Sequence, residues 1–177
     1  MNGVAALWGF AEATLFVIVP DVLLTMMAVS SLRRALIACL FALLGALAGG
    51  ALMYQWGARD RETALATLDR LPAIGPDMIR EVAAELRTHG LFALFFGPMK
   101  GVPYKIYAAQ ASAHGIGLGS FLLVSIPARL IRFGLLTLVA GMISRKGWIT
   151  WKPRRKVILL GSGWGVFYTC YFVLMPH

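Results

Sequence analysis

Charged side chains interrupt two otherwise apolar stretches of this chain, and they are the first candidates for chemistry. Residues 3–31 carry only two charges, Glu12 and Asp21, and Pro20 directly precedes the aspartate. Residues 91–119 are interrupted by two lysines, two prolines and a glycine, namely Lys100, Lys105, Pro98, Pro103 and Gly101. An ionised side chain at the centre of a bilayer costs about 2.5–3.5 kcal/mol, so such residues need a partner or a cavity.

The two groups of charges suit complementary tasks. Glu12 and Asp21 fit proton or ion coupling, because a carboxylate at depth can pair with a cation and release it on protonation. Four cations fit the binding of an anionic group through charge-assisted hydrogen bonds: Lys100, Lys105, Arg129 and Arg132. Asp21 and the four cations also have structural alternatives. Asp21 can cap a helix, and long cationic side chains can reach the membrane interface. The kink residues Pro20, Pro98, Gly101 and Pro103 keep the backbone open around these charges.

The composition is that of an integral membrane protein. Hydrophobic residues make up 59% of the 177 residues and the mean hydropathy is +0.73, whereas soluble domains are roughly 45–50% apolar. The net charge of +9 does not indicate nucleic-acid binding, because no basic stripe alternates with stacking aromatic residues. Cys39 and Cys170 lack metal-ligand spacing, and we expect neither a metal site nor a cofactor.

Apolar segment lengths predict an all-α membrane domain that extends over residues 1–177. Residues 35–56, 121–143 and 157–174 are long enough to span a bilayer. Residues 3–31 break at 19–21 and residues 91–113 break at 97–103, which predicts two re-entrant hairpins. The expected units are a hairpin plus span at 1–57, a connector at 58–89, a second hairpin plus span at 90–143, a basic loop at 144–156 and a C-terminal span at 157–177.

The distribution of Lys and Arg predicts an inverted arrangement of the two units. Arg33, Arg34 and the basic loop place eight Lys and Arg residues on one side, and the connector opposite has five that six acidic residues offset. The positive-inside rule assigns the first side to the cytoplasm. The two hairpin-plus-span units then enter from opposite faces, and their broken helices meet near the middle of the membrane.

Two further patterns concern packing. Residues 76–86 place apolar side chains at helical spacing after Gly75 and Pro76, which predicts an amphipathic helix in the connector. Gly45-x-x-x-Gly49 and Gly161-x-x-x-Gly165 indicate close helix packing, either within the chain or in a homo-oligomer.

The order of these motifs resembles the DedA family, the VTT or SNARE-associated Golgi protein domain. The first half of the resemblance lies in Glu12 with LFVIVPDVLL nearby and in LGALAGGALMYQWG at residues 44–57. The second half lies in FFGPMKGVPYK at residues 95–105 and PARLIRFG at residues 127–134, closest to the YqaA-like branch. The resemblance covers roughly residues 4–142. Two departures stand out: only Pro20-Asp21 remains of the usual Pro-x-Pro-Gly-Glu, and Lys stands where many members have Arg.

The resemblance implies a multi-pass protein of the bacterial inner membrane that moves an anionic lipid between leaflets. The lipid would be a phospholipid or a polyprenyl phosphate, and transport would be coupled to protons through Glu12 and Asp21. Lys100 and Lys105 would match the basic residues of the family's second hairpin. Two other classes stay open: a membrane scaffold or lipid-binding protein without transport, and a lipid-phosphate enzyme. The sequence carries no His-Glu-x-x-His motif, P-loop or paired-Asp metal motif that would favour the enzyme.

Overall fold

The computed structural model describes residues 1–145 and 153–174, and every regular element within these ranges is a helix. The elements are α1 (Asn2–Ala13), α2 (Asp21–Ser30), α3 (Leu32–Arg59), α4 (Arg61–Asp69), α5 (Pro76–His89), α6 (Leu91–Phe96), η1 (Gly97–Lys100), α7 (Tyr104–Ala111), η2 (Ser112–His114), α8 (Leu118–Arg145) and α9 (Pro153–Leu174). Helices α3, α8 and α9 are long and apolar enough to cross a membrane. The three predicted spans are therefore confirmed in length and composition, which indicates a membrane protein.

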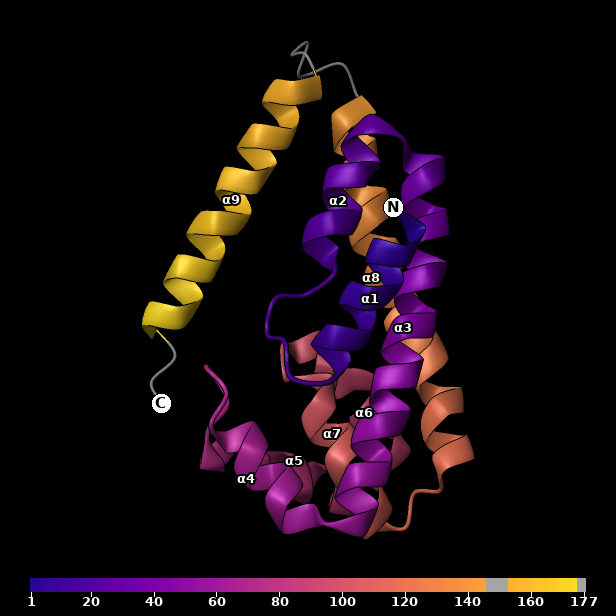
Figure 1. The fold of residues 1–177 in the computed structure, drawn as a ribbon, viewed down its shortest axis with the longest axis vertical. Coiled ribbons are helices and arrows are strands. Elements are labelled where there is room, and N and C mark those ends of the chain that lie inside the picture. The colour runs from indigo at the N-terminus through magenta and orange to yellow at the C-terminus, as the bar shows by residue number, and fades with distance from the viewer. Residues whose placement is uncertain (146–152, 175–177) are drawn as a thin grey trace.

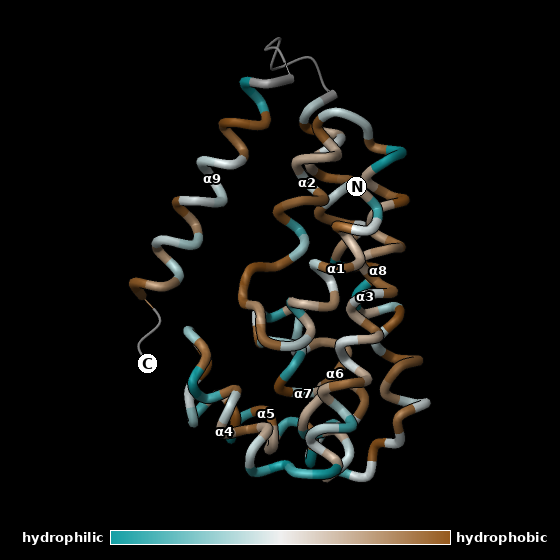
Figure 2. The backbone as a smooth tube through the Cα atoms, in the orientation of Figure 1, coloured by the Kyte–Doolittle hydropathy of each residue, from teal (hydrophilic) through white to brown (hydrophobic). Residues whose placement is uncertain are grey.

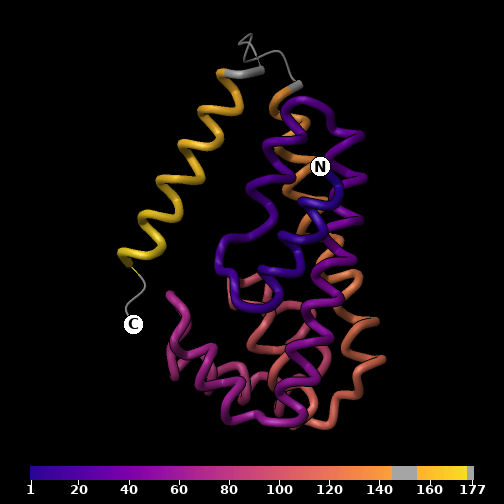
Figure 3. The backbone as a smooth tube through the Cα atoms, viewed as in Figure 1, coloured from indigo at the N-terminus to yellow at the C-terminus, as the bar shows by residue number. Residues whose placement is uncertain are grey.

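The long helices run along the longest axis of the molecule, and two short helical pairs fill the space beside them. Figures 1 and 3 show α1 and α2 beside one half of α3, and α6 and α7 beside the other half. Helix α3 contacts α1, α2, α7 and α8, so it is the common support of both pairs. Helix α9 stands apart from the bundle along much of its length and packs mainly on α2 (Figure 1).

The break in the first pair begins earlier than predicted. Helix α1 already ends at Ala13, and α2 begins at Asp21, so the non-helical segment covers residues 14–20 and not only 19–21. Three consecutive β-branched residues, Val17 to Val19, precede Pro20 and disfavour helix across this segment. Pro20 occupies the N-cap position, so Asp21 is the first residue of α2 and not its cap.

Glycines allow α1 to lie directly against α3. A Cβ atom on Gly45 would lie 1.8 Å from the carbonyl oxygen of Ala6, and one on Gly9 would lie 2.1 Å from that of Ala42. Gly49 also faces α1 closely, because its Cβ would lie 2.7 Å from the carbonyl oxygen of Phe10. The Gly45-x-x-x-Gly49 pattern therefore serves packing between α1 and α3 within the chain.

The second pair contains the predicted kink. Helix α6 continues into the short η1, and Gly101 then adopts a φ of +97°, a conformation that residues with a side chain rarely adopt. Pro103 is the N-cap residue of α7 and has an extended backbone conformation, so the helix begins at Tyr104.

The connector contains two helices, one of which the sequence did not indicate. Helix α5 begins at Pro76 and buries Val82 and Leu86, which confirms the predicted amphipathic helix. Helix α4 begins after Asp60, whose Oδ1 accepts a hydrogen bond from the Thr63 amide at 3.0 Å. The hydrogen bonds from Thr63 lower the pKa of the Asp60 carboxyl group. Figure 2 shows hydrophilic residues concentrated at this end of the molecule, outside the apolar bundle.

Candidate functional site

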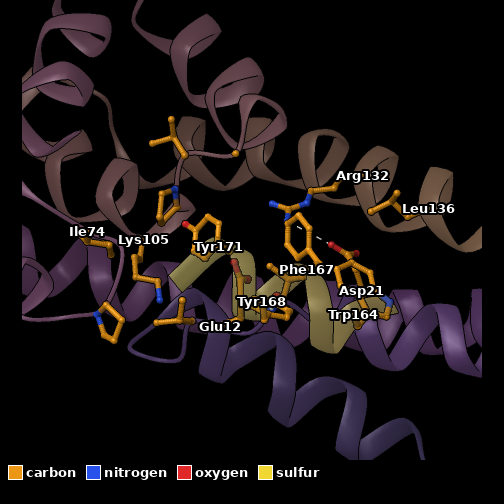
Figure 4. A pocket seen from close by; sticks show the side chains of 16 residues that line it. Glu12, Asp21, Ile74, Lys105, Arg132, Leu136, Trp164, Phe167, Tyr168 and Tyr171 are labelled. Carbon is orange, nitrogen blue, oxygen red and sulfur yellow. Dashed lines mark hydrogen bonds and ion pairs between the residues drawn. The ribbon is translucent and has the colours of Figure 1, made fainter. Parts of the chain in front are cut away.

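A cavity of about 260 Å³ lies where both helical pairs, the connector and α9 approach one another. Four charged residues line it: Glu12, Asp21, Lys105 and Arg132. Helix α9 contributes four aromatic residues to the wall: Trp164, Phe167, Tyr168 and Tyr171. Figure 4 shows Lys105 and Glu12 toward one end of this cavity, and Arg132 and Asp21 toward the other. The structure thus assembles most of the charges singled out from the sequence in one place.

Glu12 forms a buried ion pair with Arg129, just behind the cavity. Arg129 Nη1 donates a hydrogen bond to Glu12 Oε2 at 2.8 Å, and the two side chains are only 1% and 5% exposed. The guanidinium also lies 4.0 Å from the ring centre of Tyr104, a cation–π contact. Tyr104 in turn donates to Ser125 Oγ at 2.7 Å on α8. This network ties α1, α7 and α8 together at the depth of the cavity.

Asp21 and Arg132 form a looser ion pair that borders the cavity directly. Arg132 Nη2 lies 3.3 Å from Asp21 Oδ2, and the aspartate side chain is 1% exposed. The contact lacks hydrogen-bond geometry, and among the residues that the structure describes neither oxygen of Asp21 has a hydrogen-bond partner. Arg132 instead donates from Nη1 to the Pro98 carbonyl at 3.3 Å. Buried polar atoms are normally paired, so Asp21 has acceptor capacity available for a ligand.

Lys105 links the two helical pairs. The residue is 2% exposed, and its Nζ donates to the carbonyl oxygen of Phe16, in the break after α1, at 2.8 Å. An ammonium group has three donors, so this bond leaves two for other partners. Lys105 is therefore anchored at the cavity wall and can still contact an anionic group inside it.

Lys100 lies elsewhere, which separates it from the other predicted cations. Its side chain is 67% exposed and contacts Glu85 of α5 at 3.4 Å. It lines a different cavity, of about 430 Å³, between α5 and α6. The turn at Gly101 redirects the chain between Lys100 and Lys105, so two residues that are close in sequence face different surroundings.

The wall formed by α9 was missed in the sequence. A signal was present, because Trp164, Phe167, Tyr168 and Tyr171 recur at spacings of three and four residues and must share one face of a helix. Two hydrogen bonds fix that face on the first helical pair: Trp164 Nε1 donates to Thr25 Oγ1 at 3.1 Å, and the Val19 amide donates to the Tyr168 hydroxyl at 2.9 Å.

The chemistry available at this site is that of ion pairs and hydrogen bonds. Within residues 1–145 and 153–174, no three His, Cys, Asp or Glu side chains gather as ligands for a metal ion. Comparison with known proteins finds no match to a family model, a curated protein or a solved structure. The fold and the cavity define a helical membrane protein with charged residues enclosed between its helices.

Proposed function

We propose that this protein is a DedA-like transporter or flippase of the bacterial inner membrane, which moves a lipid with an anionic phosphate headgroup between leaflets. The observation that carries the proposal is the cavity that collects Glu12, Asp21, Lys105 and Arg132 among otherwise apolar helices. Charges are costly in a bilayer and occur there mainly where they face a substrate or ion pathway. In this proposal the α1–α2 and α6–α7 pairs are re-entrant hairpins that enter from opposite faces, as in transporters with inverted repeats.

The proposed binding step uses the cations that face the cavity. Lys105 and Arg132 hold the phosphate, because charge-assisted hydrogen bonds to an anion are strong where water is scarce. The carboxylate of Asp21 lies 3.3 Å from the guanidinium of Arg132 without a hydrogen bond. In this proposal Asp21 and the phosphate therefore compete for Arg132. Protonation of one of the two carboxylates, Glu12 or Asp21, would release a cation for the substrate and couple lipid movement to the proton gradient. The second carboxylate, that of Glu12, pairs with Arg129 and lines the cavity together with Lys105.

Leaflet exchange in proteoliposomes tests this function. The purified full-length chain is reconstituted, and the exchange of a labelled phospholipid and of a labelled polyprenyl phosphate is followed with and without a pH gradient. Lys105→Met retains the buried aliphatic volume and removes the charge, and we expect it to slow exchange by at least about tenfold, because a hydrogen bond to a charged group is lost. Arg80→Met removes the same formal charge from a side chain that is 76% exposed, and it serves as the matched control.

The outcomes separate the proposed function from its main alternative. Exchange that needs Lys105 and responds to the gradient supports a proton-coupled lipid pathway. If wild-type protein that is correctly folded exchanges neither lipid, the transporter proposal is rejected in favour of a scaffold or lipid-binding protein.

The different positions of Lys100 and Lys105 give a second prediction. Lys100→Met should leave exchange within about twofold of wild type, because exposed ion pairs such as Lys100–Glu85 contribute little. Its rate is compared with that of Lys105→Met in the same vesicles. Equal losses in both variants would mean that the substrate passes the cavity between α5 and α6 as well, contrary to the placement of the pathway beside α9.

A further inference from the structure

Asp21 is a buried carboxylate that borders the cavity with unused hydrogen-bonding capacity. Its side chain is 1% exposed, and within the described part of the chain both of its oxygens lack a hydrogen-bond partner. The nearby Arg132 compensates the charge at 3.3 Å but does not supply a hydrogen bond. A carboxylate can accept several hydrogen bonds, so a donor on a ligand in the cavity would complete its coordination.

The groups around Asp21 favour a particular kind of donor. Trp164 and Phe167 of α9 line the same cavity, and Figure 4 shows them beside Asp21. The aromatic cluster is internally packed. The Trp164 ring stacks on Tyr168 with ring centres 6.0 Å apart, and it lies perpendicular to the Phe167 ring with ring centres 5.7 Å apart. A carboxylate combined with aromatic faces is an arrangement by which proteins bind organic ammonium groups.

The cavity wall carries both signs of charge. The lining contains two carboxylates and two cations, so their formal charges cancel. Arg129 already compensates Glu12 at 2.8 Å, whereas Asp21 shares only a long contact with Arg132. A wall with available positive and negative groups is complementary to a ligand that carries both signs of charge.

We propose that Asp21 and the aromatic face of α9 form a subsite for the ammonium group of a zwitterionic ligand whose phosphate is held by Lys105 and Arg132. The inference rests on the proposed function and narrows its substrate to phospholipids with an ammonium headgroup, in preference to polyprenyl phosphates. Helix α9 then takes part in recognition, because its hydrogen bonds to Thr25 and Val19 hold the aromatic residues over the first helical pair.

Equilibrium binding to the full-length protein in detergent tests the subsite independently of transport. The probes are short-chain phosphatidylethanolamine and short-chain phosphatidic acid, which share chains and phosphate and differ in the ammonium group. Soluble phosphoethanolamine forms a third arm, which separates a lipid headgroup from a free compound of the same chemistry. We expect wild type to bind phosphatidylethanolamine at least about tenfold more tightly than phosphatidic acid, the effect of one charge-assisted hydrogen bond.

Two variants should remove this preference by different routes. Asp21→Asn preserves the shape of the side chain, and we expect it to abolish the preference while phosphatidic acid binds at least as well as before. Trp164→Leu should reduce the preference by about twofold to fivefold through loss of the cation–π contact. Asp69→Asn in the connector and Phe172→Leu on α9, neither of which lines the cavity, are the matched controls.

Each outcome has a definite consequence. Equal binding of the two lipids by wild type, or a preference that survives in both Asp21→Asn and Trp164→Leu, overturns the ammonium subsite and leaves the transport proposal standing. Absence of binding by either lipid overturns the ammonium subsite, and the leaflet exchange of both labelled lipids then decides the transport proposal separately. Binding of phosphoethanolamine as tight as that of the lipid supports the subsite and assigns it to a soluble ligand. Slow leaflet exchange despite selective binding overturns the transport proposal and leaves the subsite standing.

Discussion

Glu12→Leu and Arg129→Met, each made alone, are expected to lower the free energy of unfolding by about 3–5 kcal/mol, because each leaves one buried charge without its partner. The pair is enclosed, with side chains 1% and 5% exposed and a contact of 2.8 Å. Thermal unfolding of the detergent-solubilised protein, followed by circular dichroism, measures the loss.

The double variant distinguishes a lost ion pair from a general loss of packing. Two apolar side chains of similar volume remove both charges at once, and replacing a buried ion pair in this way is often neutral or stabilising. We therefore expect the free energy of unfolding of the double variant to lie within about 2 kcal/mol of wild type and to exceed that of either single variant. Destabilisations that simply add in the double variant would contradict the paired arrangement of Glu12 and Arg129.

An exposed ion pair supplies the control for this cycle. Asp77 and Arg80 are also oppositely charged and in contact, but their side chains are 92% and 76% exposed. Asp77→Leu and Arg80→Met should each change the free energy of unfolding by less than about 0.5 kcal/mol, as is usual for surface substitutions.

Gly45→Ala is expected to separate α1 from α3 and to destabilise the protein by at least about 1–3 kcal/mol, the usual cost of overpacking. The added Cβ would lie 1.8 Å from the Ala6 carbonyl oxygen, so the backbone of one helix has to move. Helix α1 also carries Glu12, and the same displacement should therefore weaken the Glu12–Arg129 pair.

The matched control for this substitution is Gly134→Ala in α8. Within the described part of the chain, and apart from Gly134's own neighbours and helix backbone, no heavy atom lies within 4 Å of a Cβ built on Gly134. Alanine should therefore stabilise the helix by up to about 1 kcal/mol through its higher helix propensity. Both variants are compared by thermal unfolding under identical conditions. If Gly45→Ala unfolds at the same temperature as Gly134→Ala, the close contact between α1 and α3 is not present in the protein.

Local features of the chain were sufficient to predict most of its helices. Apolar length alone identifies α3, α8 and α9, because the requirement to cross a bilayer is a property of one contiguous segment. The kink before α7 follows from Pro98, Gly101 and Pro103, whose backbone preferences act on adjacent residues. The cost of an ionised group in an apolar segment likewise marks Glu12 and Asp21 before any partner is known.

Which of these charged residues form ion pairs with each other depends on the tertiary structure. Glu12 and Arg129 lie 117 positions apart, and no local propensity selects Arg129 in place of Lys105 or Arg132 as the partner. The separation of Lys100 from Lys105 depends on the direction in which the chain leaves Gly101, and the use of Gly45 depends on which helix arrives beside it. Solvation and backbone preference act residue by residue, so the amino-acid sequence is sufficient to identify the apolar segments and the charges that need a partner. Only the packing of α1, α7, α8 and α9 decided which charges meet and which aromatic residues enclose them, because contacts between distant segments depend on the relative positions of whole helices.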